Sequence, residues 1–209
     1  MSSLASAFVT REALVGRTGR GGTDALSELV ERAREGDGRA FDRLMLETQE
    51  QVLGVAWRLL GSREDARDAA QEAYVRVFRH LPRFRAGHDF RAWLYRITVN
   101  VCRDAARRRR RFPTAPVSPA APEPAEEARA EQDLLGSERR ARLLEALVVL
   151  SPRERAALVL RDLEGLSSEQ VARVLGSRPG TVRGQVASAR LKIRRFCLDL
   201  IAGEKGGAR

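Results

Sequence analysis

Residues 163–196 read LEGLSSEQVARVLGSRPGTVRGQVASARLKIRRF, and this stretch decides the fold of the C-terminal half of the chain. Its apolar residues recur at helical spacing on both sides of a short turn. Ser167 or Ser168 is placed to cap a first helix, and Gly176 is placed to end it. Pro179 suits the first turn of a second helix. The stretch therefore predicts a helix-turn-helix.

The second helix of this pair is strongly basic. Seven cations and no acid lie between Arg173 and Arg195, which favours a helix that reads the major groove of DNA. On a helical wheel Gly184 and Ser188 face directly away from the apolar stripe, beside a flank of arginines. The arginines on this flank are Arg183, Arg190 and Arg194. The alternative is a structural helical hairpin whose arginines are merely solvated.

A proline-rich segment separates this half from the rest of the chain. Five of the eight prolines fall between Pro113 and Pro124, in a stretch too poor in large apolar residues to bury a core. We therefore expect a flexible linker over 112–136, helical domains over 24–111 and 137–202, a flexible N-terminal extension over 1–23 and a flexible tail over 203–209. The predicted fold class is all-α, with two small helical domains.

The formal net charge of +10 is distributed unevenly. Residues 24–75 hold 7 basic and 12 acidic side chains, whereas 76–111 hold 12 basic and 2 acidic ones. Residues 137–209 hold 15 basic and 8 acidic side chains. The two basic blocks favour nucleic acid, and the acidic block calls for a protein partner of basic charge.

The helix expected from Phe90 to Arg111 carries two stripes. One stripe is apolar and includes Phe90 and Trp93, and the other is polar. The polar residues are Arg96, Asn100, Arg103 and Arg107. Arginines beside aromatic rings are what single-stranded nucleic acid requires, because the cations follow phosphates and the rings stack on bases. The alternatives are that the rings belong to the core and that the arginine run is an ordinary solvated helix end.

The segment DARDAAQEAYVRVFRHL, residues 65–81, places its alanines on one helical face and acids on another. Asp65, Asp68 and Glu72 form the acidic stripe, which cannot attract DNA. It suits a basic protein partner, although such a stripe is commonly only a solvated surface.

The sequence lacks the residues that other classes of function require. Cys102, Cys197, His80 and His88 show no metal-ligand or disulfide spacing, so neither a metal nor a cofactor is expected. The chain has no apolar run long enough for a membrane span and no secretory leader, so a cytoplasmic protein is expected. A nuclease or recombinase with a helix-turn-helix tail would need a catalytic motif, and none is present, so the chain is not expected to be an enzyme.

Three segments in order make the chain resemble the extracytoplasmic-function (ECF) class of bacterial sigma factors, in the sigma-70 family. Residues 65–81 resemble the family's polymerase-clamp helix, and FRAGHDFRAWLYRITVNVCRDAARRRRR, residues 84–111, resembles its −10 loop and helix. Residues 150–196 resemble its −35 domain. The resemblance implies a dissociable subunit of RNA polymerase that recognises the −35 and −10 promoter elements and promotes transcription initiation. An anti-sigma factor is a further partner that it implies.

The resemblance also implies roles for particular residues. Those implied to contact core polymerase are Asp65, Asp68, Gln71, Glu72 and Arg76. Those implied for the −10 element are Arg85, His88, Asp89, Phe90, Trp93, Arg96, Asn100, Arg103 and Arg107. Those implied for the −35 element are Arg178, Thr181, Arg183, Gln185, Arg190 and Arg194.

One departure from the family pattern lies in the second helix of the turn. The family often has T-V-[KR]-S-R where this chain has Thr181, Val182, Arg183, Gly184 and Gln185, which bears on the −35 sequence that it reads. The competing hypothesis is a helix-turn-helix regulator that binds operator DNA without polymerase. It would explain the second domain but neither the acidic stripe nor the basic helix with Trp93.

Overall fold

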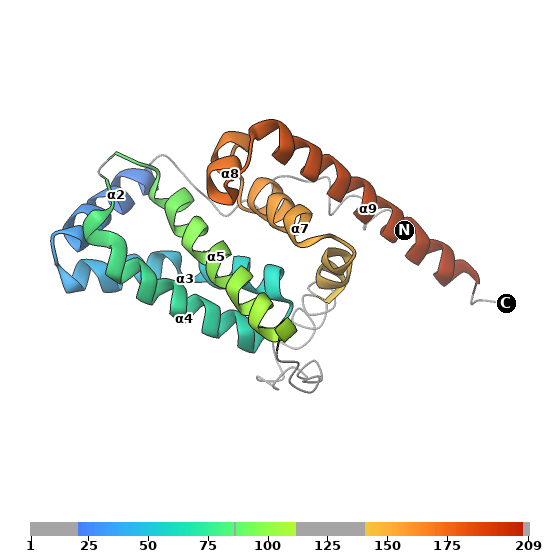
Figure 1. The fold of residues 1–209 in the computed structure, drawn as a ribbon, viewed down its shortest axis with the longest axis horizontal. Helices are drawn as coiled ribbons and strands as arrows, with labels where there is room; N and C mark the ends of the chain where they lie inside the picture. The colour runs from blue at the N-terminus through green and yellow to red at the C-terminus, as the bar shows by residue number, and fades with distance from the viewer. Residues whose placement is uncertain (1–20, 86, 112–140, 207–209) are drawn as a thin grey trace.

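The computed structural model describes residues 21–85, 87–111 and 141–206, and within these residues every regular element is a helix (Figure 1). The predicted all-α fold with two helical domains is confirmed. The linker predicted over 112–136 lies outside the described residues, as do residues 1–20 of the N-terminal extension and 207–209 of the tail.

The first domain is a bundle of four helices and one short turn. Its elements are α2 (Gly21–Arg34), α3 (Gly38–Leu60), α4 (Arg63–His80), η1 (Leu81–Arg83) and α5 (Phe90–Arg111). Local capping sets two of these boundaries. The Asp37 carboxylate accepts a hydrogen bond from the Ala40 amide at 3.1 Å, and the Ser62 hydroxyl accepts one from the Asp65 amide at 3.2 Å. The acid and the hydroxyl satisfy amides that the first turns of α3 and α4 leave without helical partners.

The second domain contains α7 (Pro152–Leu158), the π-helical turn η2 (Val159–Leu163), α8 (Ser168–Leu175) and α9 (Pro179–Gly206). Residues 141–148 are also helical. Figure 1 shows α9 as a long helix that extends beyond the other elements of this domain.

The helix-turn-helix predicted from the sequence is confirmed in its caps. The Ser167 hydroxyl accepts from the Gln170 amide at 3.1 Å, and the Gln170 side-chain oxygen accepts from the Ser167 amide at 2.7 Å. This reciprocal pair is a capping box at the start of α8. Gly176 ends α8 in the left-handed region at φ 63°, and α9 begins at Pro179.

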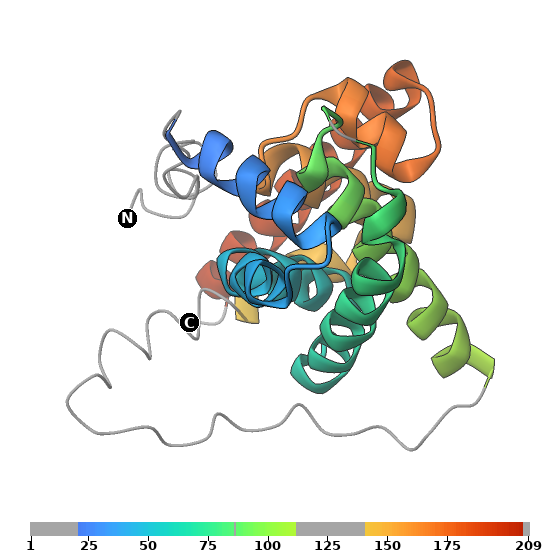
Figure 2. The ribbon, with the colours of Figure 1, turned by 90° about the vertical axis from the view of Figure 1, so that its left-hand side faces the viewer.

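One of the two apolar clusters among the described residues is shared between the domains, which the sequence did not predict. α5 packs against α8, and η2 and α7 pack against α3. Val55 of α3 and three residues of α5 belong to the hydrophobic cluster of the second domain. The α5 residues are Ala92, Tyr95 and Val99. Figures 1 and 2 agree in placing α5 between the rest of its own bundle and α8.

Candidate nucleic-acid and partner interfaces

An aromatic cluster lies where the chain enters α5. The ring centroids of Phe84 and Phe90 are 5.7 Å apart in an edge-to-face pair, and Trp93 lies 5.0 Å from Phe84 and 5.7 Å from Phe90. Both phenylalanines are only 7% exposed, whereas Trp93 is half-buried. The burial favours the core alternative for Phe90. Trp93 packs against both phenylalanines, and part of its ring remains accessible to solvent.

The loop before α5 exposes Arg85, His88 and Asp89. The His88 amide donates to the Arg85 carbonyl at 3.3 Å, which closes the loop on itself. One carboxylate oxygen of Asp89 accepts from the Ala92 amide at 3.0 Å and so caps α5. Its other oxygen accepts from the Gln170 side-chain amide of α8. Both oxygens of Asp89 are therefore engaged within the protein.

α5 presents the predicted basic surface. Arg96, Asn100 and Arg107 are exposed and Arg103 is half-buried. Burial lowers the pKa of the Arg103 guanidinium, and the positive charges of Arg153 and Arg107 lower it further. These cations crowd together with little acid to neutralise them, so the surface is suited to a polyanion.

The acidic stripe of α4 is largely paired inside the protein. Asp65 accepts from Arg109 of α5 at 2.8 Å. Arg76 donates to Glu72 at 2.8 Å and to Asp104 of α5 at 3.3 Å. The Glu72 hydrogen bond is the main cause that raises the pKa of Arg76. Asp65 and Arg76, both predicted to bind polymerase, thus also tie α4 to α5, whereas Glu72 is paired within α4.

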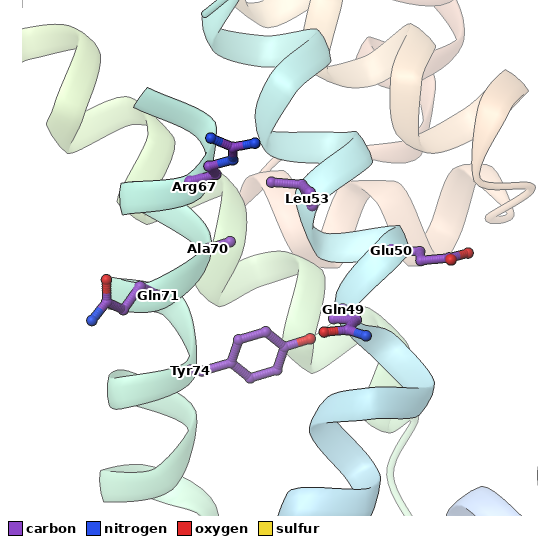
Figure 3. Close-up of a pocket in the computed structure, with 7 residues that line it drawn as sticks. All are labelled: Gln49, Glu50, Leu53, Arg67, Ala70, Gln71 and Tyr74. Atoms are coloured by element: carbon purple, nitrogen blue, oxygen red, sulfur yellow. The ribbon is translucent and has the colours of Figure 1, made fainter. Parts of the chain in front are cut away.

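The other two residues predicted to bind polymerase, Asp68 and Gln71, are exposed. Gln71 borders a pocket of about 410 Å³ between α3 and α4 (Figure 3). The pocket is lined by Gln49, Glu50, Leu53, Arg67, Ala70, Gln71 and Tyr74. In Figure 3 the Tyr74 ring points toward α3, where its hydroxyl lies 2.9 Å from the Thr48 hydroxyl.

Large apolar side chains of α3 and α4 are also exposed, and one of them, Leu53, lines this pocket. They are Leu46 (57%), Leu53 (40%), Val75 (38%) and Phe78 (63%). The sequence interpretation missed this apolar contribution of α3 and α4. The detectable signal is that Leu46 and Leu53, seven residues apart, stand off the buried face that contains Leu44 and Val52. We call the surface formed by Asp68, Gln71 and these four apolar residues the α3–α4 face.

The start of α9 exposes Arg178, Thr181 and Arg183. Arg183 makes only a loose ion pair with Glu169 of α8, at 3.8 Å, and both side chains are well exposed. The donors predicted to read bases are therefore accessible at the N-terminal end of the second helix of the turn.

Farther along α9 the predicted residues differ in availability. Arg190 makes a bidentate pair with Asp162, at 2.7 and 2.9 Å, which raises the pKa of Arg190, whereas Arg194 is exposed. Gln185 is half-buried, and its side-chain oxygen has no hydrogen-bond donor among the described residues. The arginine flank is thus not uniformly free for DNA.

One wheel prediction is wrong. Ser188 does not face directly away from the core, because its hydroxyl donates to the Glu154 carboxylate of α7 at 2.6 Å. Lys192 donates to the same carboxylate at 2.8 and 2.9 Å. The helical wheel was oriented only by the apolar stripe of α9. In the structure α7 also packs against a part of α9 outside this stripe, and that part includes Ser188. These bonds, with that from the Ser151 hydroxyl, lower the pKa of Glu154 to about 2.

Neither sulfur nor acid clusters suggest a cofactor. Among the described residues no group of His, Cys, Asp and Glu could hold a metal ion. Cys102 is buried and Cys197 is half-buried, and both are free thiols. No helix in the described part of the chain is long and apolar enough to cross a membrane.

The geometry describes a two-domain helical protein with a helix-turn-helix, a basic aromatic-bearing helix and a separate apolar face. The model of Sigma-70 region 2 matches residues 44–112, and that of Sigma-70 region 4 matches residues 140–193. The chain belongs to the ECF class of the sigma-70 family. It is accordingly a sigma factor of transcription initiation.

Individual relatives agree with this assignment. RNA polymerase sigma-H factor of Pseudomonas aeruginosa is 37% identical over 182 residues, which cover 83% of this chain and 94% of the relative. ECF RNA polymerase sigma factor SigE of Mycolicibacterium smegmatis is 39% identical over 162 residues, 75% of this chain and 61% of the relative. CnrH, solved in complex with the cytosolic domain of CnrY, matches with a TM-score of 0.65 at 27% identity, over 84% of this chain and 98% of CnrH.

Proposed function

We propose that this sigma factor binds core RNA polymerase through the α3–α4 face and α4, reads the −10 element with α5 and its preceding loop, and reads the −35 element with the start of α9. The observation that carries the proposal is the exposure of the residues predicted for each partner. Asp68, Gln71 and four large apolar side chains are exposed on α3 and α4, whereas most of the arginines predicted to bind DNA are exposed on α5, in the loop before it and on α9.

The α3–α4 face has the composition of a protein interface. Leu46, Leu53, Val75 and Phe78 offer exposed apolar area, with Leu53 at the pocket itself, and Asp68 and Gln71 supply polar groups. Asp65, Glu72 and Arg76 adjoin this surface but are partly neutralised by their ion pairs. We therefore assign the larger share of polymerase binding to Asp68, Gln71 and the apolar residues.

For the −10 element, the exposed members of the loop and helix are the direct contacts. Arg85 and His88 flank the loop, and Trp93 offers its accessible edge. Arg96, Asn100, Arg103 and Arg107 follow the phosphates. Phe90 is buried, so it stabilises the loop by packing and does not contact DNA. Asp89 caps the start of α5.

For the −35 element, Arg178, Thr181 and Arg183 contact bases or phosphates at the start of α9, and Arg194 contacts phosphate. Arg190 must leave Asp162 before it can bind DNA. Gln185 is half-buried, so it contributes mainly to the shape of the surface.

The remaining partners and properties follow from family membership. CnrH was solved bound to a cytosolic domain of another protein, which supports an anti-sigma factor as the regulatory partner of this chain. We propose a cytoplasmic, non-catalytic subunit that needs no cofactor. The rival hypothesis, a regulator that acts without polymerase, predicts tight operator binding by the isolated chain.

The deciding experiment is run-off transcription with purified core polymerase and a pool of promoter templates. We expect promoter-specific transcripts only when this chain is added. Operator-like DNA binding that is unaffected by core polymerase, with no transcript, would favour the rival hypothesis.

A further inference from the structure

The cations of α9 differ in how firmly the rest of the second domain holds them. Between Pro179 and Ala202 the helix carries one acid, Asp199, and five cations. Two of these cations are exposed and make no ion pair with another described residue, whereas acids from other elements engage the remaining three. The unpaired cations are Arg194 and Arg195, and the paired ones are Arg183, Arg190 and Lys192.

The pair nearest the start of α9 is loose. Arg183 lies 3.8 Å from Glu169 of α8, and the two side chains are 65% and 59% exposed. Such a pair contributes little, because water solvates both charges. Arg183 is therefore available to DNA at the end of the helix where readers of the major groove contact bases.

Arg190, two turns farther along, is held by a well-formed pair. Its Nε and Nη2 groups donate to the two carboxylate oxygens of Asp162 at 2.9 and 2.7 Å. This two-point geometry is among the strongest pairings of an arginine with a carboxylate. Asp162 lies in η2 and its side chain is only 25% exposed, so the release of Arg190 would leave a partly buried carboxylate without its partner.

Lys192 is held by a carboxylate that is itself fixed in place. Its ammonium donates to both oxygens of Glu154 of α7, at 2.9 and 2.8 Å. Glu154 is 8% exposed, and it also accepts from the Ser188 hydroxyl at 2.6 Å and from the Ser151 amide at 2.9 Å. Because these two bonds keep the carboxylate where it is, a departing Lys192 would leave a buried charge without its cation.

Holding two cations matters because contacts to phosphate carry no sequence information. Each phosphate that a protein neutralises releases counterions and strengthens binding to DNA of any sequence. On random DNA, free cations can engage phosphates in many orientations of the helix. On a matched −35 element, base contacts at the start of α9 fix one orientation. Cations farther along the helix therefore add more to random binding than to matched binding.

We propose that Asp162 and Glu154 are positioning residues that set the specificity of −35 recognition, because they withhold Arg190 and Lys192 from the phosphates of non-promoter DNA. The inference rests on the proposed function, which assigns the −35 element to α9. The cations of α9 that remain free for DNA are Arg183, Arg194 and Arg195. Both acids act through the cations that they hold and need no contact with DNA themselves.

The test measures binding of the full chain to a fluorescent random-sequence duplex over a series of salt concentrations, without core polymerase. Asp162→Asn is the main variant, because Arg190 is 62% exposed and the loss of its pair should leave the fold intact. Glu154→Gln is the second variant, and its melting temperature reports whether it folds. Asp199→Asn is the matched control, because it removes the same charge from an exposed position on α9 that holds no cation.

We expect Asp162→Asn to bind the random duplex more tightly than wild type does. The slope of log affinity against log salt should steepen by about 0.9, the value for one added phosphate contact. Glu154→Gln should act in the same direction, and Asp199→Asn should keep the wild-type slope. Adding Arg190→Gln to Asp162→Asn should remove the gain, because the released cation is then absent.

The holoenzyme gives the second readout. A promoter recovered from the run-off pool is compared with the same promoter carrying a scrambled −35 element. We expect the holoenzyme with Asp162→Asn to prefer the matched element less strongly than the wild-type holoenzyme does, since the released Arg190 adds more to scrambled binding.

Acid variants whose salt slopes equal that of Asp199→Asn would overturn the proposal, and so would a gain that survives Arg190→Gln. An undiminished preference for the matched −35 element would overturn it as well. Absence of promoter-specific transcripts from the wild-type chain would instead overturn the proposed function, and the measurement on random duplex does not depend on that outcome. The two failures are therefore distinguishable.

Discussion

The Tyr95 hydroxyl donates a 2.7 Å hydrogen bond to Glu164, a residue 69 positions further along the chain and in the other domain. Burial raises the pKa of the Tyr95 phenol well above its ordinary value, and the Glu164 carboxylate raises it further. The phenol therefore stays protonated as a hydrogen-bond donor at any physiological pH. This pair couples the helix that we propose reads the −10 element to the domain that we propose reads the −35 element.

Reversing the charge of Asp68 tests the polymerase interface. Asp68→Arg should weaken co-purification with core polymerase while leaving the helical content unchanged, because Asp68 is exposed and has no ion pair among the described residues. Asp65→Arg is a less clean change, since it also breaks the pair with Arg109. Glu64→Arg, at an exposed neighbouring position, is the matched control. Equal polymerase recovery by Asp68→Arg and Glu64→Arg would contradict the assignment of this face.

Truncation of Trp93 separates its packing role from its DNA role. Trp93→Ala should lower the free energy of unfolding by about 2–4 kcal/mol, because the ring packs on Phe84 and Phe90. It should also impair transcription from duplex promoters more than from promoters that are already melted. Trp57→Ala removes another partly buried indole of the same domain and serves as the control. If both variants lose stability but neither distinguishes the two templates, Trp93 is only a core residue.

Arg183 and Arg194 are expected to contribute differently to −35 recognition. Arg183→Ala should reduce discrimination between matched and scrambled −35 elements by about 1–3 kcal/mol, because Arg183 is exposed near the start of α9, where base edges are read. Arg194→Ala should weaken both elements alike, as the loss of a phosphate contact does. Competition binding of the holoenzyme measures both. If Arg183→Ala instead weakened binding to matched and scrambled elements equally, this arginine would contact only the DNA backbone.

The Glu154 network predicts a pH dependence of stability. Its pKa in the folded chain is about 2, below its ordinary value of 4.5, chiefly because Lys192 donates to it. Its contribution is therefore fully present above about pH 5 and is lost as the pH falls toward 2. Glu154→Gln should cost about 2 kcal/mol at neutral pH and flatten this part of the profile in urea unfolding. A profile as steep as that of wild type would place the acid sensitivity elsewhere.

The two thiols should react at different rates. Burial raises the pKa of Cys102 to about 12, whereas Cys197 is only half-buried and its pKa is raised less. Since the thiolate is the nucleophile, iodoacetamide at pH 8 should modify Cys197 first. Mass spectrometry of time points measures this order, and Cys197→Ser should leave a chain that reacts only slowly. Rapid labelling of Cys102 would show that α5 opens readily.

Local chemistry in the sequence was sufficient for several features. A helix cap at Ser167 or Ser168, a helix end at Gly176 and a helix start near Pro179 were predicted because each depends on residues within one or two turns. The basic character of α5 was equally readable, since charge is a property of composition. The same holds for the all-α fold, because helical periodicity is visible along the chain.

Only the tertiary structure decided which of these residues are available. Arg190 and Ser188 looked free on a helical wheel, but Asp162 and Glu154 approach them from other elements. The contact between the two domains through Glu164 could not be predicted from the sequence either, because it joins residues separated by 69 and 106 positions. Periodicity fixes which face of a helix is apolar. Which partner covers that face depends on how the helices pack together, and no local pattern encodes that choice.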